Sequence, residues 1–367
     1  MKLTISKETL LEQLTHVVGA VEKKHTSKIL ENILIHASEE KLKLIGTDLE
    51  IEMSSEFPTQ AEEAGKITAP ARKLFEICKA LPADCFVMFE TEGDRLHIKG
   101  LRSRFELATL PADEYPLLDD IPIQNEINIP EKDLKTLLEK VSFSMANQDV
   151  RYYLNGLLLE LSNDKLLSVS TDGHRLAVSE FSLNNKSNNT LKIIVPRKGI
   201  LELSRLLDST SDLPVTLQIS DNHIRVNKDN IRFTSKLIDG KYPDYQAAIP
   251  ANCSHTIELD REQFKSTLAR VSILSNEKFR GIRLRLKDGT MTLHSNNPEN
   301  ESAEEEIDIN YSGDLFEIGF NVTYLLEAVN HLEGNTVNLE LSTPDSSALL
   351  HSPDDTQTRY VVMPIRL

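Results

Sequence analysis

Apolar residues recur at helical spacing in three segments that each begin with a short alternating stretch. The segments are KLTISKETLLEQLTHVV (2–18), EINIPEKDLKTLLEKVSFSM (126–145) and HTIELDREQFKSTLARVSIL (255–274). Alternation over four to six residues is typical of a half-buried strand, and apolar residues three and four apart form one face of a helix. Each segment therefore predicts a strand followed by an amphipathic helix.

A second strand and helix follow later in each third of the chain. The segments are KITAPARKLFEICKALP (66–82), KIIVPRKGILELSRLLD (192–208) and EIGFNVTYLLEAVNHLE (317–333), and Pro70 and Pro196 are expected in the first helical turn. Each third ends with a predicted strand: RFELATLP (104–111), IRFTSKLI (231–238) and RYVVMPIRL (359–367).

The repeat length is that of a domain. Pro70 and Pro196 are 126 residues apart, and Val195 and the matching Phe320 are 125 apart. This period is too long for a solenoid repeat. The sequence predicts an α+β protein of three similar domains, each with two helices and antiparallel sheets, at 1–124, 125–250 and 251–367.

Composition excludes several classes of protein. The chain has 367 residues, 40% of them hydrophobic, and a formal net charge of −16, which argues against a uniformly basic DNA-binding surface. Cys78, Cys85 and Cys253 have neither CxxC spacing nor an even count, so neither a disulfide framework nor a zinc site is expected. We see no signal peptide and no membrane span, and expect a cytoplasmic protein without cofactor or metal.

The stretch TDGHRLAV (171–178) raises the question of catalysis. His174 could act as a general base oriented by Asp172, but no Ser or Cys nucleophile motif accompanies them. The first third carries TDLEIEM (47–53) at the same place, without His or Arg. Thr-Asp is therefore interpreted first as a turn between strands, in which Asp binds local backbone. An enzyme using Asp172 and His174 stays open as an alternative.

Basic residues are concentrated at corresponding helices. Arg72 and Lys73 open one helix, and Arg197 and Lys198 open its counterpart, although cations oppose the dipole at a helix N-terminus. Other lysines are expected at the end of the first helix (Lys23, Lys24) and on the polar face of the third (Lys132, Lys135, Lys140). Ordinary solvated lysines would also explain any one of them. The repeated placement favours a loosely bound, anionic partner such as nucleic acid.

Longer blocks of the chain resemble one family. They include QDVRYYLNGLLLE, STDGHRLAVSE, VPRKGILEL, FTSKLIDGKYPDY, ILSNEKFRGIRL, GFNVTYLLEAVN and YVVMPIRL. They are similar to the β sliding clamp, the processivity subunit of bacterial DNA polymerase III. The resemblance implies a head-to-tail homodimeric ring around duplex DNA, which a clamp loader places on DNA and which tethers the polymerase catalytic subunit. A nonspecific DNA-binding or scaffolding protein that never closes a ring is the nearest alternative.

The resemblance also implies functional residues. A pocket for peptides of polymerases, the loader and repair proteins would comprise Leu154, Thr171, Gly173, His174, Arg175, Leu176, Pro243, Val362, Met363, Pro364, Ile365 and Arg366. The edge formed by Gln246, Ala247 and Ala248 departs from the larger or basic residues frequent in the family. Weak DNA contacts are expected from Lys24, Arg72, Lys73, Gln148, Tyr152, Tyr153, Arg197 and Lys198.

A dimer interface is expected between the first domain and the partner's third domain. Phe105 and Leu107 would pack against Ile273 and Leu274. The acidic run PENESAEEEID (298–308), a solvated or ion-paired edge by its composition, would supply Glu299, Glu301, Glu304 and Glu305 to face Arg95, Arg102 and Arg104.

Overall fold

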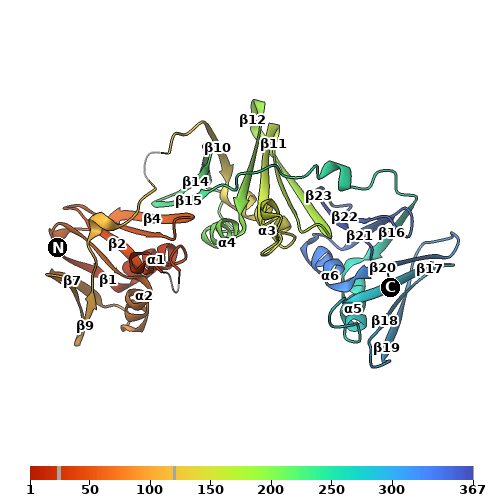
Figure 1. The fold of residues 1–367 in the computed structure, drawn as a ribbon, viewed down its shortest axis with the longest axis horizontal. Coiled ribbons are helices and arrows are strands. Elements are labelled where there is room, and N and C mark those ends of the chain that lie inside the picture. The colour runs from red at the N-terminus through yellow and green to blue at the C-terminus, as the bar shows by residue number, and fades with distance from the viewer. Residues whose placement is uncertain (23–25, 119–120, 367) are drawn as a thin grey trace. The chain divides into compact units, whose positions relative to one another are not determined.

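The computed structural model describes residues 1–22, 26–118 and 121–366, and all six predicted helices lie within them (Figure 1). The helices are α1 (Lys7–Val18), α2 (Ala71–Ala80), α3 (Glu131–Ser142), α4 (Arg197–Leu206), α5 (Arg261–Ser272) and α6 (Val322–His331). The first helix ends at Val18, so the prediction that Lys23 and Lys24 end it was wrong, and both lysines lie outside the described residues.

Local side-chain hydrogen bonds start several of these helices. The Ser6 side chain accepts from Thr9 N at 3.2 Å before α1, and the Asp260 side chain accepts from Gln263 N at 2.7 Å before α5. Both satisfy a backbone donor that the first helical turn leaves unpaired. Pro70 and Pro196 immediately precede α2 and α4, one position earlier than predicted.

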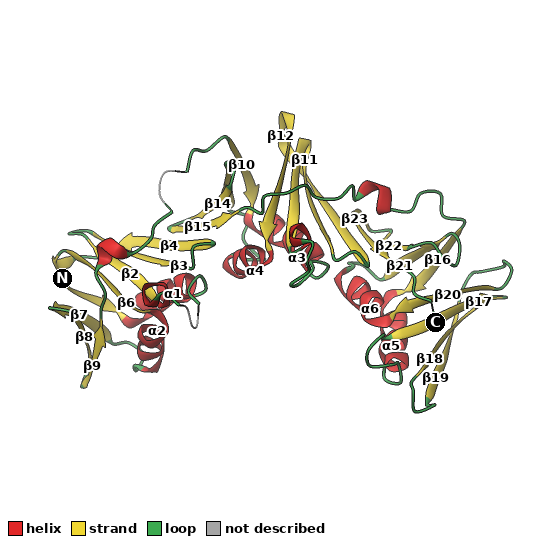
Figure 2. Cartoon of the chain, viewed as in Figure 1, coloured by secondary structure: helices red, strands yellow, loops and turns green. Residues whose placement is uncertain are grey.

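The strands form four antiparallel sheets (Figure 2). The five-stranded sheet has the order β5 (Ala61–Glu63), β1 (Lys2–Ser6), β7 (Phe86–Glu92), β8 (Arg95–Gly100) and β9 (Ser103–Ala108). The eight-stranded sheet has the order β10 (Asn125–Pro130), β13 (Pro214–Ile219), β14 (His223–Lys228), β15 (Ile231–Lys236), β4 (Ile51–Pro58), β3 (Lys41–Thr47), β2 (Asn32–Ala37) and β6 (Gly65–Pro70).

The other two sheets contain the remaining strands. The six-stranded sheet has the order β11 (Gly156–Thr171), β12 (Arg175–Pro196), β23 (Asp355–Val362), β22 (Ala348–Ser352), β21 (Thr336–Leu341) and β16 (His255–Asp260). The four-stranded sheet has the order β19 (Ser302–Asp308), β18 (Thr290–Asn296), β17 (Gly281–Lys287) and β20 (Phe316–Asn321).

The chain packs as two compact units. One comprises residues 1–134 with 198–237, and the other comprises residues 135–197 with 238–367. In the first unit, α1 and α2 pack against each other, and Leu10 and Leu74 on them are fully buried. In the second unit, α5 and α6 do the same with Phe264 and Leu325. Each unit thus contains one pair of helices predicted from the repeat.

Strands of successive repeats pair directly within each unit. β15, the closing strand of the second repeat, pairs antiparallel with β4, and β23, the closing strand of the third, pairs with β12. β4 and β12 are corresponding strands of the first and second repeats, since each begins after the Thr-Asp turn of its repeat. The corresponding strand of the third repeat is β19. The closing strand of the first repeat is β9. Both lie at the end of their own sheets.

Candidate functional site

Asp172 builds the turn between β11 and β12. Its Oδ1 accepts hydrogen bonds from His174 N and Arg175 N at 2.9 and 3.1 Å. Gly173 has a φ of +86°, and a Cβ at that position would lie 2.8 Å from the Arg151 guanidinium. Glycine is therefore required both by the backbone conformation and by the lack of space.

The first repeat contains the same turn. Asp48 Oδ1 accepts from Glu50 N at 2.9 Å and from Ile51 N at 2.8 Å. The interpretation of Thr-Asp as a recurrent turn is confirmed. In the second repeat the Asp172 carboxylate binds backbone and Arg175, so these contacts do not make it an orienting partner for the His174 imidazole.

Arg175 connects the turn to α6 through hydrogen bonds. Its Nε donates to Asp172 Oδ2 at 3.1 Å, its Nη2 donates to Phe143 O at 2.8 Å, and its Nη1 donates to Glu327. The guanidinium lies 4.6 Å from the centre of the Tyr324 ring, and the side chain is only 10% exposed. A largely buried cation with carboxylate, carbonyl and aromatic partners holds the turn in one position.

Tyr324 was missed in the sequence. Its ring stacks on the exposed His174 ring at 6.4 Å and 18°, so the two side chains form one aromatic wall. Burial, followed by the charge of Asp172, raises the pKa of Tyr324. The sequence contained a signal for Tyr324. The second helix of the third repeat begins with Val-Thr-Tyr, whereas its counterparts in the first two repeats carry cations at their start.

An apolar cluster lies behind the turn. Leu154 and Leu176 are buried in it together with Tyr242 and Val361. Pro243 is exposed and, with the Tyr242 and Ile194 side chains, lines a hollow of about 440 Å³. Gln246 forms part of the same hollow, at the start of a short exposed 3-10 turn.

The tail after β23 lies against this turn. Val362 is buried and pairs with Arg175, and Met363 N donates to His174 O at 2.9 Å. Met363 itself is 47% exposed. The structure therefore brings the tail as far as Met363 beside the Thr171–Leu176 segment.

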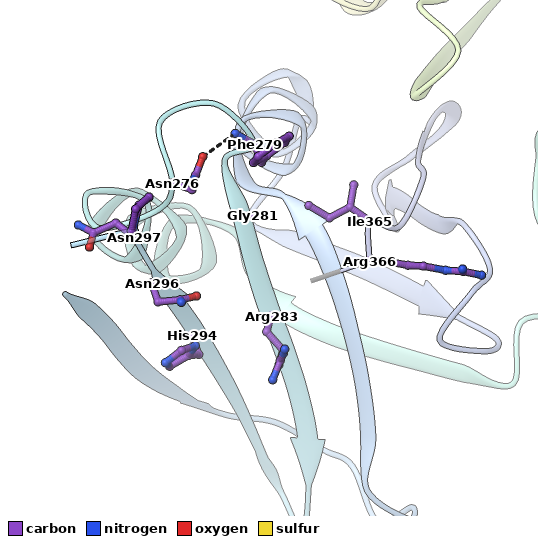
Figure 3. Close-up of a pocket in the computed structure, with 10 residues that line it drawn as sticks. Asn276, Phe279, Gly281, Arg283, His294, Asn296, Asn297, Ile365 and Arg366 are labelled. Carbon is purple, nitrogen blue, oxygen red and sulfur yellow. Dashed lines mark hydrogen bonds between the residues drawn. The ribbon is translucent and has the colours of Figure 1, made fainter. Parts of the chain in front are cut away.

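Beyond Met363 the tail reaches a different hollow. Ile365 N donates to Gly319 O at 2.8 Å on β20, so Ile365 and Arg366 lie by the four-stranded sheet. They contribute to a separate cavity of about 610 Å³ (Figure 3). The cavity is lined by Asn276, Phe279, Gly281, Arg283, His294, Asn296, Asn297, Pro298, Ile365 and Arg366. Sequence reasoning did not separate the two hollows.

The expected DNA contacts differ in their surroundings. Arg72 and Lys73 are exposed, with no ion pair to another described residue. Lys198 is paired with Asp48 and, at 3.2 Å, with Glu22. Burial disfavours its charge, yet the hydrogen bond to Asp48 leaves its pKa raised. Arg197 donates to Met145 O at 3.0 Å. Lys198 is therefore not the open cation that the sequence suggested.

Carboxylates also pair with the lysines of α3. Lys132 lies 2.5 Å from Asp212, and Lys140 lies 2.7 Å from Asp355. Lys135 lies 3.4 Å from Glu139. A partner would have to displace these acids, so the lysines of α3 are a weaker anion-binding surface than their number implies.

The segment QDVRYY presents a partly exposed surface. Gln148 is exposed with a φ of +58°, and Tyr152 is 57% exposed. Tyr153 is half-buried and packs against the apolar cluster. Hydrogen bonds from Arg151 lower the pKa of Asp149 to about 2. Arg151 also donates to Asp172 O at 3.0 Å, which ties this segment to the Thr171–Arg175 turn.

The expected interface residues are unequally exposed. Ile273, directly after α5, is 74% exposed, and Leu274 and Phe105 are half-buried. Leu107 is only 7% exposed, because it already faces the core of its own sheet. Glu305 forms a bidentate pair with Arg270 at 2.6 and 2.7 Å, so within the chain it already has a cation.

Replacing Arg175 by alanine is expected to lower the free energy of unfolding by about 2–4 kcal/mol, because the largely buried Asp172 carboxylate loses its cation. Urea denaturation followed by circular dichroism measures the loss. The matched control is Lys165→Ala, which removes a half-exposed cation paired with Glu180 at 2.8 Å and should cost less than about 1 kcal/mol. Equal losses in the two variants would contradict the anchoring role.

The chain matches three family models in succession. They describe the N-terminal, central and C-terminal domains of the DNA polymerase III beta subunit, and match residues 1–119, 128–244 and 246–366. The chain belongs to the β sliding clamp family. The beta sliding clamps of Pseudomonas aeruginosa and Escherichia coli are 45% and 44% identical to it, over 100% of each chain.

Solved clamp structures share the fold. The DNA polymerase III subunit beta of Pseudomonas aeruginosa superposes with a TM-score of 0.96 at 45% identity, over 100% of both chains. The Caulobacter crescentus pol III beta superposes at 0.95 with 38% identity, again over 100% of both chains. One Pseudomonas aeruginosa clamp structure contains bound griselimycin.

As a sliding clamp, the chain is a non-catalytic subunit of the polymerase holoenzyme, and the catalytic interpretation of Asp172 and His174 is wrong. Among the residues that the structure describes, no three His, Cys, Asp or Glu side chains gather as metal ligands would. Within the same part of the chain, no helix has the length and apolarity needed to cross a membrane.

Proposed function

We propose that two copies of this clamp close head to tail into a ring around duplex DNA, and that a clamp loader assembles the ring there. The ring tethers the polymerase catalytic subunit and docks other replication and repair proteins in the cytoplasm, where the chromosome lies. Its three domains span 1–124, 125–250 and 251–367, as the repeat indicates. The observation that carries the proposal is that β9 and β19 each end a described sheet, whereas their counterparts in the other repeats pair as β15 with β4 and β23 with β12.

The strand pairing between repeats within one chain indicates how two copies of the chain would pair. Closing strands β15 and β23 each pair with the strand that follows a Thr-Asp turn, namely β4 and β12. By the same rule, β9 of one copy pairs with β19 of the other. Such an interface joins two different surfaces, yet it closes, since two copies each supply both.

The template also specifies the register. Ile51 pairs with Ser235, and Arg175 pairs with Val362. In the third turn Asn297 Oδ1 accepts from Glu301 N at 2.9 Å, which places Glu301 at the position of Ile51 and Arg175. Glu301 is then opposite the partner's Leu107, and Glu304 is opposite the partner's Arg104. An opposite-charge pair facing across strands favours this register.

Ring closure accounts for the acidic surface. DNA that is enclosed needs only mild attraction from the inner helices, so a net charge of −16 is compatible with retention. Among the described cations proposed to contact DNA, Arg72 and Lys73 are the most exposed. Arg197, Gln148, Tyr152 and Tyr153 are proposed as additional weak contacts, and Lys198 contributes only if DNA displaces Asp48.

Direct binding of a short linear duplex is expected to be weak and to fall steeply between 50 and 200 mM salt, by roughly tenfold or more if two or more phosphates are neutralised. Fluorescence anisotropy with a labelled duplex measures the affinity. Exchanging both Arg72 and Lys73 for alanine should flatten the salt dependence, whereas Lys165→Ala should leave it unchanged. Tight binding that salt does not weaken would contradict retention by enclosure.

The proposed function is tested by topology. After loading by a clamp loader and ATP, the ring should stay on a circular plasmid during gel filtration and leave the same plasmid once it is linearised. The free protein should elute as a dimer of about 83 kDa, twice the 41.4 kDa protomer. A monomer, or equal retention on both plasmids, would favour a DNA-binding scaffold that never closes.

The peptide site is proposed beside the Thr171–Leu176 turn. Its supports are the apolar cluster with Leu154 and Leu176, the exposed Met363, and the wall of His174 and Tyr324. An adaptable methionine beside aromatic and apolar walls, with backbone groups at the rim, suits short peptides of varied sequence.

A further inference from the structure

The cavity beside Ile365 is the third copy of a space that recurs in every repeat. Ile365 bonds to Gly319, as Ile238 bonds to Ile194 at 2.8 Å and Thr68 to Leu110 at 3.3 Å. Thr68, Ile194 and Gly319 correspond to one another, because each lies two residues before the residue that immediately precedes the second helix of its repeat. The three spaces can therefore be compared position by position.

A tyrosine of the chain packs into the first space, and in the second a tyrosine lines the hollow of about 440 Å³ that remains. Tyr115 is 5% exposed, and its hydroxyl accepts from Thr47 N at 3.1 Å and donates to Asn32 O at 3.1 Å. Tyr242 is 8% exposed within the second cluster. The described part of the third repeat places no tyrosine in the corresponding cavity, whose lining residues are those of Figure 3.

The floors of these spaces differ in charge. Leu34 and Ile45 face each other across the strands of the first repeat and pack with Tyr115. Leu158 and Val169 take these positions in the second repeat. In the third repeat the same cross-strand pair is Arg283 and His294. Their positions follow from the register, because Asn32, Gly156 and Gly281 pair with Pro70, Pro196 and Asn321 respectively.

The neighbouring acids offset this floor only in part, although Glu301 Oε2 accepts from Asn297 Nδ2 at 2.7 Å at the wall. Glu317 is shared, since Arg283 Nε lies 3.2 Å and Arg285 Nε 3.1 Å from its oxygens. Lys278 lies 5.4 Å from the centre of the Phe279 ring at the rim. Glu304 is opposite His294, but in the proposed ring it is drawn towards the partner's Arg104. One carboxylate between two guanidiniums leaves an excess of positive charge.

We infer that this cavity binds carboxylate side chains of a peptide whose apolar part occupies the pocket beside Met363; the inference rests on the proposed peptide site. Arg283 offers planar donors that match a carboxylate, and Asn296 offers further polar contacts at the wall. The apolar rim from Phe279 and Ile365 packs against the peptide backbone. Figure 3 shows Ile365 on the tail beside these residues, whereas Arg366 extends away from the strands.

The two sites are within reach of one short peptide. Met363 and Ile365 are two residues apart along the tail, which is at most about 7 Å. A peptide bound against Met363 therefore needs only a few additional residues to reach Arg283. Acidic flanks would distinguish strong partners from weak ones by adding contacts, without altering the apolar pocket that all partners share.

The experiment uses the full-length dimer and a labelled peptide that copies the clamp-binding segment of the polymerase III catalytic subunit. The peptide is extended by three aspartates or three serines, at either end, giving four probes. At 150 mM salt, aspartates at one end should tighten binding about threefold to tenfold over serines. Arg283→Leu, which installs the residue type of Leu34 and Leu158, should abolish that gain and leave the serine probes unaffected.

Arg285→Leu is the matched control, because it removes the other partner of Glu317 from the same strand but does not line the cavity. It should keep most of the gain. Loss of the gain in both variants alike would indicate general attraction and overturn the inference. No gain from aspartate with normal serine-probe binding would overturn the cavity alone, whereas failure of every probe to bind would overturn the peptide site and the inference with it.

Discussion

Replacing Ile273 and Leu274 by alanine together is expected to convert the dimeric clamp into a folded monomer of 41.4 kDa. Ile273 is 74% exposed in the single chain, so most of its apolar surface is available to a partner. Truncating two such side chains removes about 3–5 kcal/mol of burial from one interface. A closed dimer contains the interface twice, so the loss counts twice and the dissociation constant rises by several orders of magnitude.

Sedimentation velocity at micromolar concentration measures the outcome, and circular dichroism checks that the monomer is folded. Leu213 and Leu315, 63% and 60% exposed, provide a matched pair of exposed leucines outside the proposed interface. Alanine at both should leave the dimer intact. A stable dimer in the Ile273 and Leu274 variant would show that the first and third domains do not meet at this helix end.

The inferred register can be tested by charge reversal. Glu304→Arg alone and Arg104→Glu alone should each weaken the dimer, because like charges then face each other across the strands. The chain carrying both changes should recover dimerisation, since each interface regains one pair of opposite sign. If the double change is weaker than either single one, Glu304 and Arg104 are not opposite each other.

The repeat was the part of the sequence that predicted most of the fold. All six helices, the closing strands and the Thr-Asp turn are present in the predicted order, because amphipathic periodicity and Asx turns depend on neighbours in the chain. Their ends were predicted less well, since the first helix ends at Val18 and the last strand at Val362. Charge was predicted less well. Lys198 has the spacing of an open cation, yet Asp48, 150 residues earlier, neutralises it. Such partners come together only through tertiary contacts, which a pattern along the chain does not contain.

The candidate site was likewise only partly predictable from the sequence. The resemblance placed the tail beside the Thr171–Leu176 turn, and Met363 lies there, but the Ile365 contact with Gly319 depends on the edge of β20. Glu327 was missed because it lies 152 residues from Arg175, and no pattern along the chain pairs the two. The Arg283 and His294 pair was visible only once strand register aligned it with Leu34 and Ile45.

Deleting residues Met363–Leu367 is expected to abolish binding of a clamp-binding peptide while leaving the dimer and its thermal stability nearly intact. The deletion removes two backbone hydrogen bonds, Met363 N to His174 O and Ile365 N to Gly319 O, each worth about 1 kcal/mol. Tyr360 and Val362, which are 1% exposed, remain in β23. The melting temperature should therefore fall by no more than about 4 °C.

Peptide affinity should fall at least about a hundredfold, because the exposed Met363 wall and the tail carbonyls and amides are lost together. Anisotropy with the labelled peptide measures this, and primer extension on a long template should show short products. Met363→Leu keeps the apolar volume and should bind within a fewfold of the native chain, which separates the loss of a wall from general damage. Unchanged affinity in the truncated dimer would place the peptide site elsewhere, and the turn held by Asp172 and Arg175 would then serve only the packing of α6 against β12.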